Sequence, residues 1–235
     1  MTKDLKVLVI IPAYNEAEAI LATVRDVERC GYDYVVINDG SKDDTLGVCR
    51  ANNVNVVDLP QNLGIGGAVQ CGHMYARDHG YDVDVQVDGD GQHDPQYISN
   101  LLHAMEIEQA SLVIGSRFVE RTEGFQSTWL RRLGITWLSM CLKLFTGNRV
   151  TDPTSGFRAC NRDAIELFCC DYPVDYPEPE SIATALRNGL AVCETPVVMK
   201  ERQGGSSSIS GFSSVYYMIK VTLAILIACL GRRAK

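Results

Sequence analysis

The sequence lacks several patterns that mark common classes of protein. It has no C-x-x-C pair among its nine cysteines, so a structural zinc site is not expected. It has neither the lysine motif of a P-loop nor the G-x-G-x-x-G dinucleotide fingerprint. Residues 1–6 are charged and only five apolar residues follow, at 7–11, which does not fit a secretory signal peptide. We therefore expect a cytoplasmic protein whose cysteines are reduced and mostly buried.

Acidic residues are in excess, but basic residues gather in two zones. The net charge of −7 argues against a general nucleic-acid-binding protein. Residues 117–149 nevertheless hold six Lys/Arg and two acids, and residues 200–235 hold six Lys/Arg and one acid. Such zones favour an anionic partner, either a membrane surface or phosphate groups. The alternative is that they form two solvated helix faces.

The longest apolar stretch, at 215–230, has 16 residues and includes Lys220. A bilayer-spanning helix needs about 20 apolar residues. We expect a helix lying in the membrane interface, with the basic residues at 232–235 on the lipid headgroups. The alternative is a terminal helix docked on the core.

The 235 residues, 46% of them hydrophobic and 22% charged, predict a folded protein of one large domain with at most a small appendage. Short apolar runs and helical stretches alternate. Expected strands lie at 7–11, 34–38, 54–59, 83–87, 112–115 and 191–199, and expected helices at 15–30, 44–53, 67–79, 95–109, 127–145, 163–170, 178–188 and 215–230. This alternation predicts an α/β fold with a mostly parallel sheet and helices on both faces. In such sheets, ligands bind beyond the carboxyl ends of the strands.

The strongest chemical signal is the D-x-D pair Asp88 and Asp90, directly after the expected strand at 83–87. Carboxylates at alternate positions project to the same side and can hold a hard divalent cation. The intervening glycines let the backbone approach a ligand. A solvated turn is the alternative for the pair, and Asp94 before Pro95 is typical of a helix N-cap.

Six segments together resemble one known family. They lie, in order, at 9–16, 38–43, 62–68, 88–95, 115–118 and 152–158. The chain resembles family 2 glycosyltransferases of the GT-A fold and, within them, the polyprenyl-phosphate (dolichol-phosphate mannose synthase-like) transferases. The resemblance covers residues 7–158 and, more loosely, the remainder. It implies a GT-A domain over 1–211, with a nucleotide-sugar half (7–118) and an acceptor half (119–211), followed by a membrane-associating helix over 212–235.

The resemblance also implies roles for individual residues. It assigns nucleotide-sugar binding to Pro12, Tyr14, Glu16, Asp39, Asn62, Gly66 and Asp88; a divalent metal, Mg²⁺ or Mn²⁺, to Asp88, Asp90 and Gln92; acceptor and donor phosphates to Arg117, Arg131, Arg132 and Arg202; and catalysis to Asp90, Arg117 and Asp152. Alternatives remain for four of these positions. Asp39 also fits a turn or N-cap residue, the glycine turn at Gly66 also fits a purely structural role, and Arg131 and Arg132 also fit contact with lipid headgroups.

The expected reaction is inverting transfer of a hexose from a nucleotide-sugar, UDP in preference to GDP or dTDP, to a polyprenyl phosphate. A phosphate acceptor is already anionic and needs no general base. A second possibility, transfer to a hydroxyl of a cell-surface glycan, needs a base, for which Asp152, Glu178 and Glu180 are candidates. The proline-rich segment 176–180 departs from the pattern of the relatives. A third possibility is a non-catalytic nucleotide-sugar-binding protein. We expect peripheral attachment at the cytoplasmic face of the membrane, and a homo-oligomer is compatible with the sequence.

Overall fold

The computed structural model describes residues 5–119, 129–200 and 213–230. Its elements are β1 (Val7–Ala13), α1 (Ile20–Arg29), β2 (Asp33–Asn38), α2 (Thr45–Ala51), β3 (Val56–Asp58), α3 (Gly64–Asp78), β4 (Val83–Gln86), the 3₁₀ turn η1 (Pro95–Tyr97), α4 (Ile98–Glu108), β5 (Leu112–Ser116), α5 (Trp129–Thr146), β6 (Arg158–Asn161), α6 (Arg162–Cys170), α7 (Pro177–Arg187), β7 (Val192–Pro196) and α8 (Ser213–Leu230). The strands of these ranges form one sheet in the order β3-β2-β1-β4-β6-β5-β7.

The sheet is parallel except at β6, which runs antiparallel to both β4 and β5. The mostly parallel α/β sheet predicted from the sequence is therefore confirmed. The strand β6 was not predicted. Its four residues, Arg158–Asn161, include no β-branched side chain, and they are extended because they fill the space between β4 and β5.

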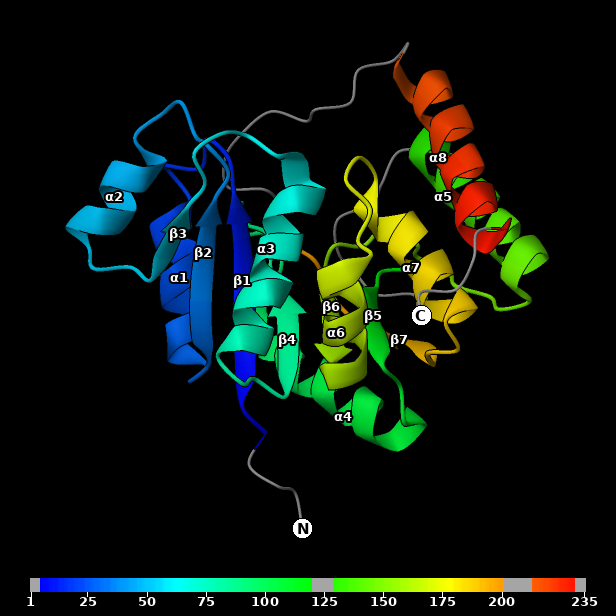
Figure 1. The fold of residues 1–235 in the computed structure, drawn as a ribbon, viewed down its shortest axis with the longest axis horizontal. Coiled ribbons are helices and arrows are strands. Elements are labelled where there is room, and N and C mark those ends of the chain that lie inside the picture. The colour runs from blue at the N-terminus through cyan, green and yellow to red at the C-terminus, as the bar shows by residue number, and fades with distance from the viewer. Residues whose placement is uncertain (1–4, 120–128, 201–212, 231–235) are drawn as a thin grey trace.

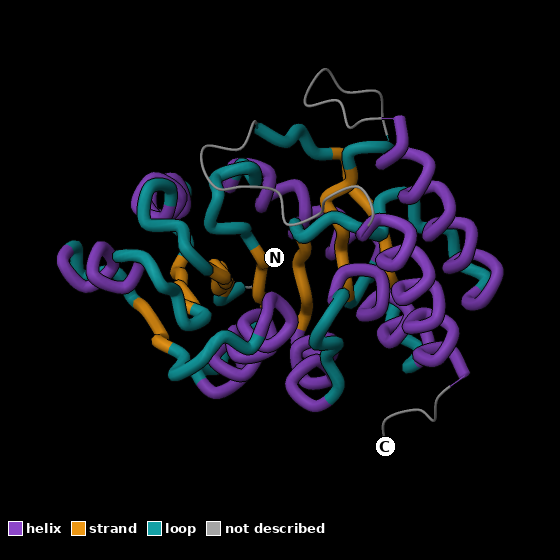
Figure 2. Tube along the Cα trace, turned by 90° about the horizontal axis from the view of Figure 1, so that it is seen from above, coloured by secondary structure: helices purple, strands orange, loops and turns teal. Residues whose placement is uncertain are grey.

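Helices cover both faces of the sheet (Figures 1 and 2). Strand β1 is buried along its whole length, as expected for a central strand of a parallel sheet. Its side chains alternate: Leu8 and Ile10 point into the core with α3 and α6, whereas Val9 and Ile11 point into the core with α1 and α4. This packing leaves the carboxyl ends of β1, β2 and β4 at one edge, which Figure 2 views from above.

The helices α5, α7 and α8 lie side by side beyond β5 and β7 (Figure 1). Val221 and Ile225 on the inner face of α8 are buried in the core. Arg187 of α7 donates from Nη1 to the carbonyl oxygen of Ala228 at 2.7 Å, so it caps the last turn of α8. The expected C-terminal helix is thus docked on the protein. Within the described ranges, no helix has the length and apolarity needed to cross a membrane.

Candidate active site

The segments that follow β1 and β2 are joined by hydrogen bonds. Asn15 adopts a left-handed conformation with φ 58°, and its Oδ1 accepts from the Lys42 backbone N–H at 2.8 Å. The backbone N–H of Glu16 donates to Oγ1 of Thr45 at 2.9 Å. These contacts explain why α1 begins at Ile20 and not at the predicted residue 15. They also place Tyr14, which is exposed, at the edge of the sheet.

Asp39 directly follows β2 and is 3% exposed. Its Oδ1 accepts from the Leu63 backbone N–H at 2.7 Å, and its carbonyl oxygen accepts from Nδ2 of Asn62 at 3.1 Å. Two of the predicted nucleotide-binding residues, Asp39 and Asn62, therefore lie in contact. A carboxylate fixed in this way at a strand end is suited to accept a further hydrogen bond from the N–H of a base.

Gly66 packs against the loop before α7. A Cβ atom at Gly66 would overlap with the carbonyl oxygen of Pro173, so the absence of a side chain lets this loop lie on α3. Pro12 is also buried, and its carbonyl oxygen lies beside Gly89. Gly66 and Pro12 therefore contribute to this edge of the sheet through close backbone contacts and not through side-chain functional groups.

The D-x-D turn follows β4 at the same edge. Asp90 is 4% exposed, and its Oδ1 accepts from the backbone N–H of Gln92 at 3.0 Å. The carboxylate of Asp88 is more open, with 35% of its side chain exposed. A Cβ atom on Gly156 would lie 3.2 and 3.3 Å from the two carboxylate oxygens of Asp88. Gly156 belongs to the predicted segment 152–158. Because it has no side chain, the Asp88 carboxylate can lie close to its backbone.

Arg117 follows β5 and forms a two-point ion pair with Asp152. The backbone N–H groups of Thr151 and Asp152 donate to Glu194 of β7 at 2.7 and 2.8 Å. Asp152 is fully buried and accepts from the Arg117 guanidinium with both of its oxygens. This geometry favours a role for Asp152 in holding Arg117 over a role as a general base. Glu194, which orders the turn behind them, was not among the candidates from the sequence.

Glu178 and Glu180 lie in the first turn of α7. Burial raises the pKa of Glu178, the Arg158 guanidinium opposes that shift, and the Asp88 carboxylate adds to it. Burial and the carboxylates of Asp171 and Asp175 raise the pKa of Glu180. The Asp88 carboxylate of the D-x-D turn therefore contributes to the raised pKa of Glu178, whereas other carboxylates contribute to that of Glu180.

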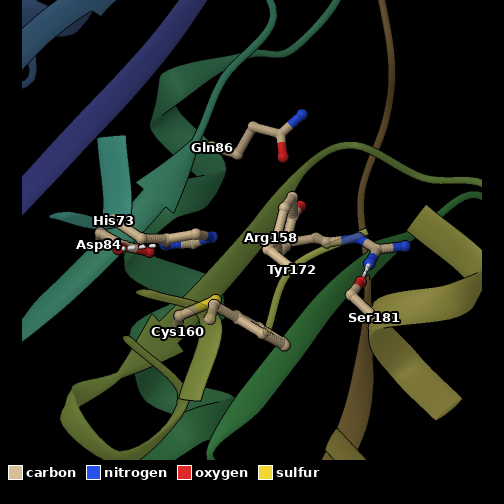
Figure 3. A pocket seen from close by; sticks show the side chains of 8 residues that line it. His73, Asp84, Gln86, Arg158, Cys160, Tyr172 and Ser181 are labelled. Carbon is tan, nitrogen blue, oxygen red and sulfur yellow. Dashed lines mark hydrogen bonds and ion pairs between the residues drawn. The ribbon is translucent and has the colours of Figure 1, made fainter. Parts of the chain in front are cut away.

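A small cavity of about 10 Å³, room for one water molecule, lies between β4, β6 and the helices α3, α6 and α7 (Figure 3). It is lined by His73, Asp84, Gln86, Arg158, Cys160, Phe168, Tyr172 and Ser181. Nδ1 of His73 lies 2.7 Å from Oδ2 of Asp84. The buried Arg158 donates to Oγ of Ser181 at 2.8 Å and to two backbone carbonyl oxygens. The cavity is thus ordered by hydrogen bonds, and Gln86 connects it to Asp88 at 3.2 Å.

The remaining candidates are basic residues. Arg132 lies exposed on α5. Arg131 is on the same helix, but its side chain lies outside the described part, as does all of Arg202. The structure therefore brings together the predicted residues of β1, β2, β4 and β5, while the placement of Arg131 and Arg202 relative to them stays a prediction.

Comparison with known proteins fits this arrangement. Residues 8–168 match the family described as Glycosyl transferase family 2. The chain is 32% identical over 227 residues to polyprenol monophosphomannose synthase of Mycolicibacterium smegmatis, covering 92% of this chain and 85% of that protein. It is 33% identical over 220 residues to undecaprenyl-phosphate mannosyltransferase of Micrococcus luteus, covering 88% of each.

Solved structures agree on the fold. Glucosyl-3-phosphoglycerate synthase of Mycobacterium tuberculosis, in complex with Mn²⁺, uridine diphosphate and phosphoglyceric acid, aligns with a TM-score of 0.71 over 99% of this chain and 81% of that one, at 19% identity. The predicted GT-A fold is confirmed by this match. The chain belongs to glycosyl transferase family 2 and is a glycosyltransferase.

Proposed function

We propose that the enzyme transfers a hexose, with inversion, from a nucleoside diphosphate sugar to a polyprenyl phosphate at the cytoplasmic face of the membrane. The observation that carries the proposal is the D-x-D turn at the carboxyl edge of β4, in a chain whose relatives at 32% and 33% identity are named for transfer to polyprenol or undecaprenyl phosphate. UDP is the nucleotide we expect in preference to GDP or dTDP, as bound in the structural neighbour.

The donor set fits a divalent cation such as Mg²⁺ or Mn²⁺. Asp88, Asp90 and Gln92 offer oxygen ligands, which hard cations prefer. Within the described part of the chain, Oδ2 of Asp88 accepts no hydrogen bond, and Gly156 leaves space beside it. When bound, the cation neutralises the charge that develops on the leaving nucleoside diphosphate. Asp39 and Asn62 would orient the base and ribose beside it.

The residues that we propose for the acceptor phosphate supply positive charge, and such an acceptor needs no general base. Arg117 is oriented by Asp152, and Nη1 of its guanidinium makes no hydrogen bond within the described ranges. An arginine held in this way is suited to bind phosphate. A phosphate acceptor is already anionic, so its alignment with the anomeric carbon is the main requirement. We assign Arg117 to that phosphate, with Arg131, Arg132 and Arg202 as further candidates.

An apolar surface on α5 and α8 is suited to contact the membrane. Its exposed side chains are Leu133, Trp137, Met140 and Leu144 on α5 and Ile219, Leu223, Ile227 and Leu230 on α8. Each set repeats at helical spacing and so forms one stripe. The segments 129–149 and 213–235 contain no Asp or Glu. We call these eight side chains the outer apolar face, and we propose that it lies on an anionic bilayer.

A transfer assay tests the proposal. The enzyme is incubated in detergent with undecaprenyl phosphate and a panel of radiolabelled UDP-, GDP- and dTDP-sugars, with and without EDTA. Label in the lipid fraction that EDTA abolishes is the expected result, and it names the sugar. Hydrolysis of a donor without lipid product contradicts the acceptor assignment. Binding of a donor without any turnover contradicts catalysis and favours a nucleotide-sugar-binding role.

Transfer to a glycan hydroxyl is the second candidate function, and the position of Glu178 is the observation that favours it. A hydroxyl acceptor needs a base within reach, and Glu178 interacts electrostatically with Asp88. With a phosphate acceptor, Glu178→Gln should retain transfer within about tenfold. A loss of about 10²–10⁴-fold, the usual contribution of a general base, would indicate the hydroxyl acceptor instead.

A further inference from the structure

His93 lies in the same turn as Asp88 and Asp90, and its side chain is buried. Its Nδ1 accepts a hydrogen bond from the backbone N–H of Asp88 at 3.0 Å. A ring nitrogen that accepts from an amide carries no proton, so the proton of the neutral imidazole is on Nε2. Nε2 lies 3.7 Å from Oδ2 of Asp88. One imidazole ring therefore faces both the backbone and the carboxylate of the same residue.

The His93 ring is itself supported from another part of the sheet. It stacks on Phe157, with ring centroids 5.1 Å apart and planes inclined by 13°. Phe157 is 1% exposed, and its carbonyl oxygen accepts from the Gly115 N–H at 2.8 Å. Because Phe157 directly precedes β6 and its carbonyl oxygen bonds to β5, the ring on which His93 stacks is held by these two strands.

The opposite side of the Asp88 carboxylate is also restrained. Nε2 of Gln86 donates to Oδ1 of Asp88 at 3.2 Å, so Oδ1 is occupied. Nε2 of His93 is 3.7 Å from Oδ2, beyond hydrogen-bond distance, so the N–H group faces that oxygen without occupying it. Gln86 thus restrains Oδ1, and His93 restrains the Asp88 backbone and lies beside Oδ2, which stays open.

We propose that His93 is a positioning residue that holds Asp88 in the orientation needed to bind a divalent cation together with the nucleoside diphosphate. The inference rests on the proposed function, because it requires the cation to bind at the D-x-D turn. A carboxylate that is already oriented loses less conformational freedom on binding. Residues that orient metal ligands in this way typically change metal affinity by 10–100-fold when they are replaced.

Two substitutions separate positioning from simple packing. His93→Phe retains a ring that can stack on Phe157 but removes both nitrogen atoms. His93→Asn retains an acceptor near the position of Nδ1 but has no group at the position of Nε2. His103→Phe makes the same change on the exposed face of α4 and is the matched control.

The measurement is the affinity for Mn²⁺ in the presence of saturating UDP, followed by electron paramagnetic resonance of the free ion. We expect His93→Phe to raise the Kd for Mn²⁺ by about 10–100-fold, His93→Asn to raise it by less, and His103→Phe to leave it unchanged. Near-ultraviolet circular dichroism in EDTA checks that each variant is folded. If His93→Phe does not fold, the Mn²⁺ affinity of His93→Asn is the test. A several-fold loss of that affinity supports the inference, and wild-type affinity overturns it.

The outcomes also distinguish this inference from the function on which it rests. Equal Mn²⁺ affinity in the wild type and a folded His93→Phe variant would show that the ring only fills space, and the proposed function would stand. Failure of the wild type to bind Mn²⁺ with UDP would overturn the metal-dependent function itself, and the role of His93 with it.

Discussion

The guanidinium of Arg117 and the carboxylate of Asp152 lie face to face, with Nε–Oδ2 and Nη2–Oδ1 distances of 2.7 Å. The backbone N–H of Arg117 adds a third contact to Oδ2 at 3.1 Å. These bonds join the end of β5 to the turn before Gly156. The Arg117 side chain, which we assign to the acceptor phosphate, is therefore already oriented by Asp152 in the absence of a ligand.

The first prediction concerns the stability that this ion pair provides. Asp152→Asn removes the negative charge and leaves the largely buried Arg117 guanidinium uncompensated. Breaking a buried pair in this way should lower the free energy of unfolding by about 3–5 kcal/mol, measured by urea denaturation. Asp171→Asn is the matched control, because the Asp171 side chain is 47% exposed and its pair with Arg187 should contribute no more than about 1 kcal/mol. Equal effects of the two substitutions would contradict this account.

The second prediction concerns the D-x-D turn. Asp90→Asn keeps the size of the side chain and its Oδ1 acceptor for the Gln92 N–H, but it removes a charge from the proposed metal site. We expect transfer to fall by at least about 100-fold, while the urea midpoint changes little. Asp58→Asn, on the far edge strand β3, should retain full activity. Full activity of Asp90→Asn would show that the metal assignment is wrong.

The sequence predicts most of the sheet because its strands are apolar, short and regularly spaced. The run at 7–11 is β-branched or leucine throughout, and it forms the central strand β1. β6 has no such signal: Arg158 and Asn161 are polar, and the strand exists because β4 and β5 flank it. Its antiparallel direction depends on the path of the chain through the 151–158 segment, which no local pattern specifies.

The candidate site shows the same division. Asp39, Asp88 and Asp90 could be placed together because parallel strands bring their carboxyl ends to one edge. Their supporting residues could not be predicted, since each acts through a contact between distant segments. Glu194, for example, accepts from the Asp152 N–H across 42 positions of sequence. The 215–230 stretch is apolar on nearly all sides, so its sequence did not distinguish a helix in the membrane interface from one docked on the core. The structure shows one face of α8 buried and the other exposed.

The third prediction is a dependence of stability on pH. Burial raises the pKa of Glu178 above its ordinary value of 4.5, so folding favours the protonated carboxyl. Its contribution to stability is then fully present below about pH 4.5 and is lost as the pH rises through the raised pKa. Glu178→Gln mimics the protonated form, and it should raise the free energy of unfolding at pH 7 but not at pH 4.

Urea denaturation of the wild type and of Glu178→Gln at pH 4, 5.5 and 7 checks this. The difference between the two proteins should grow with pH, because only the wild type has to bury a charge at neutral pH. Glu106→Gln, on an exposed turn of α4, serves as the control and should show no such growth. A difference that is the same at all three pH values would mean that the substitution acts through packing alone.

The last prediction concerns the outer apolar face. Deleting α8 would uncover the core at Val221 and Ile225, so point substitutions on the exposed side are the cleaner test. Leu144→Glu and Leu223→Glu each remove an exposed apolar side chain, worth about 1.5–3 kcal/mol when buried, and add a negative charge. Each should weaken binding to vesicles that contain phosphatidylglycerol by at least about tenfold, as measured by co-sedimentation. Ile107→Glu makes an equivalent change on α4, where the side chain is 63% exposed, and should bind like the wild type. If all three variants bind like the wild type, the contact with the membrane lies elsewhere on the protein.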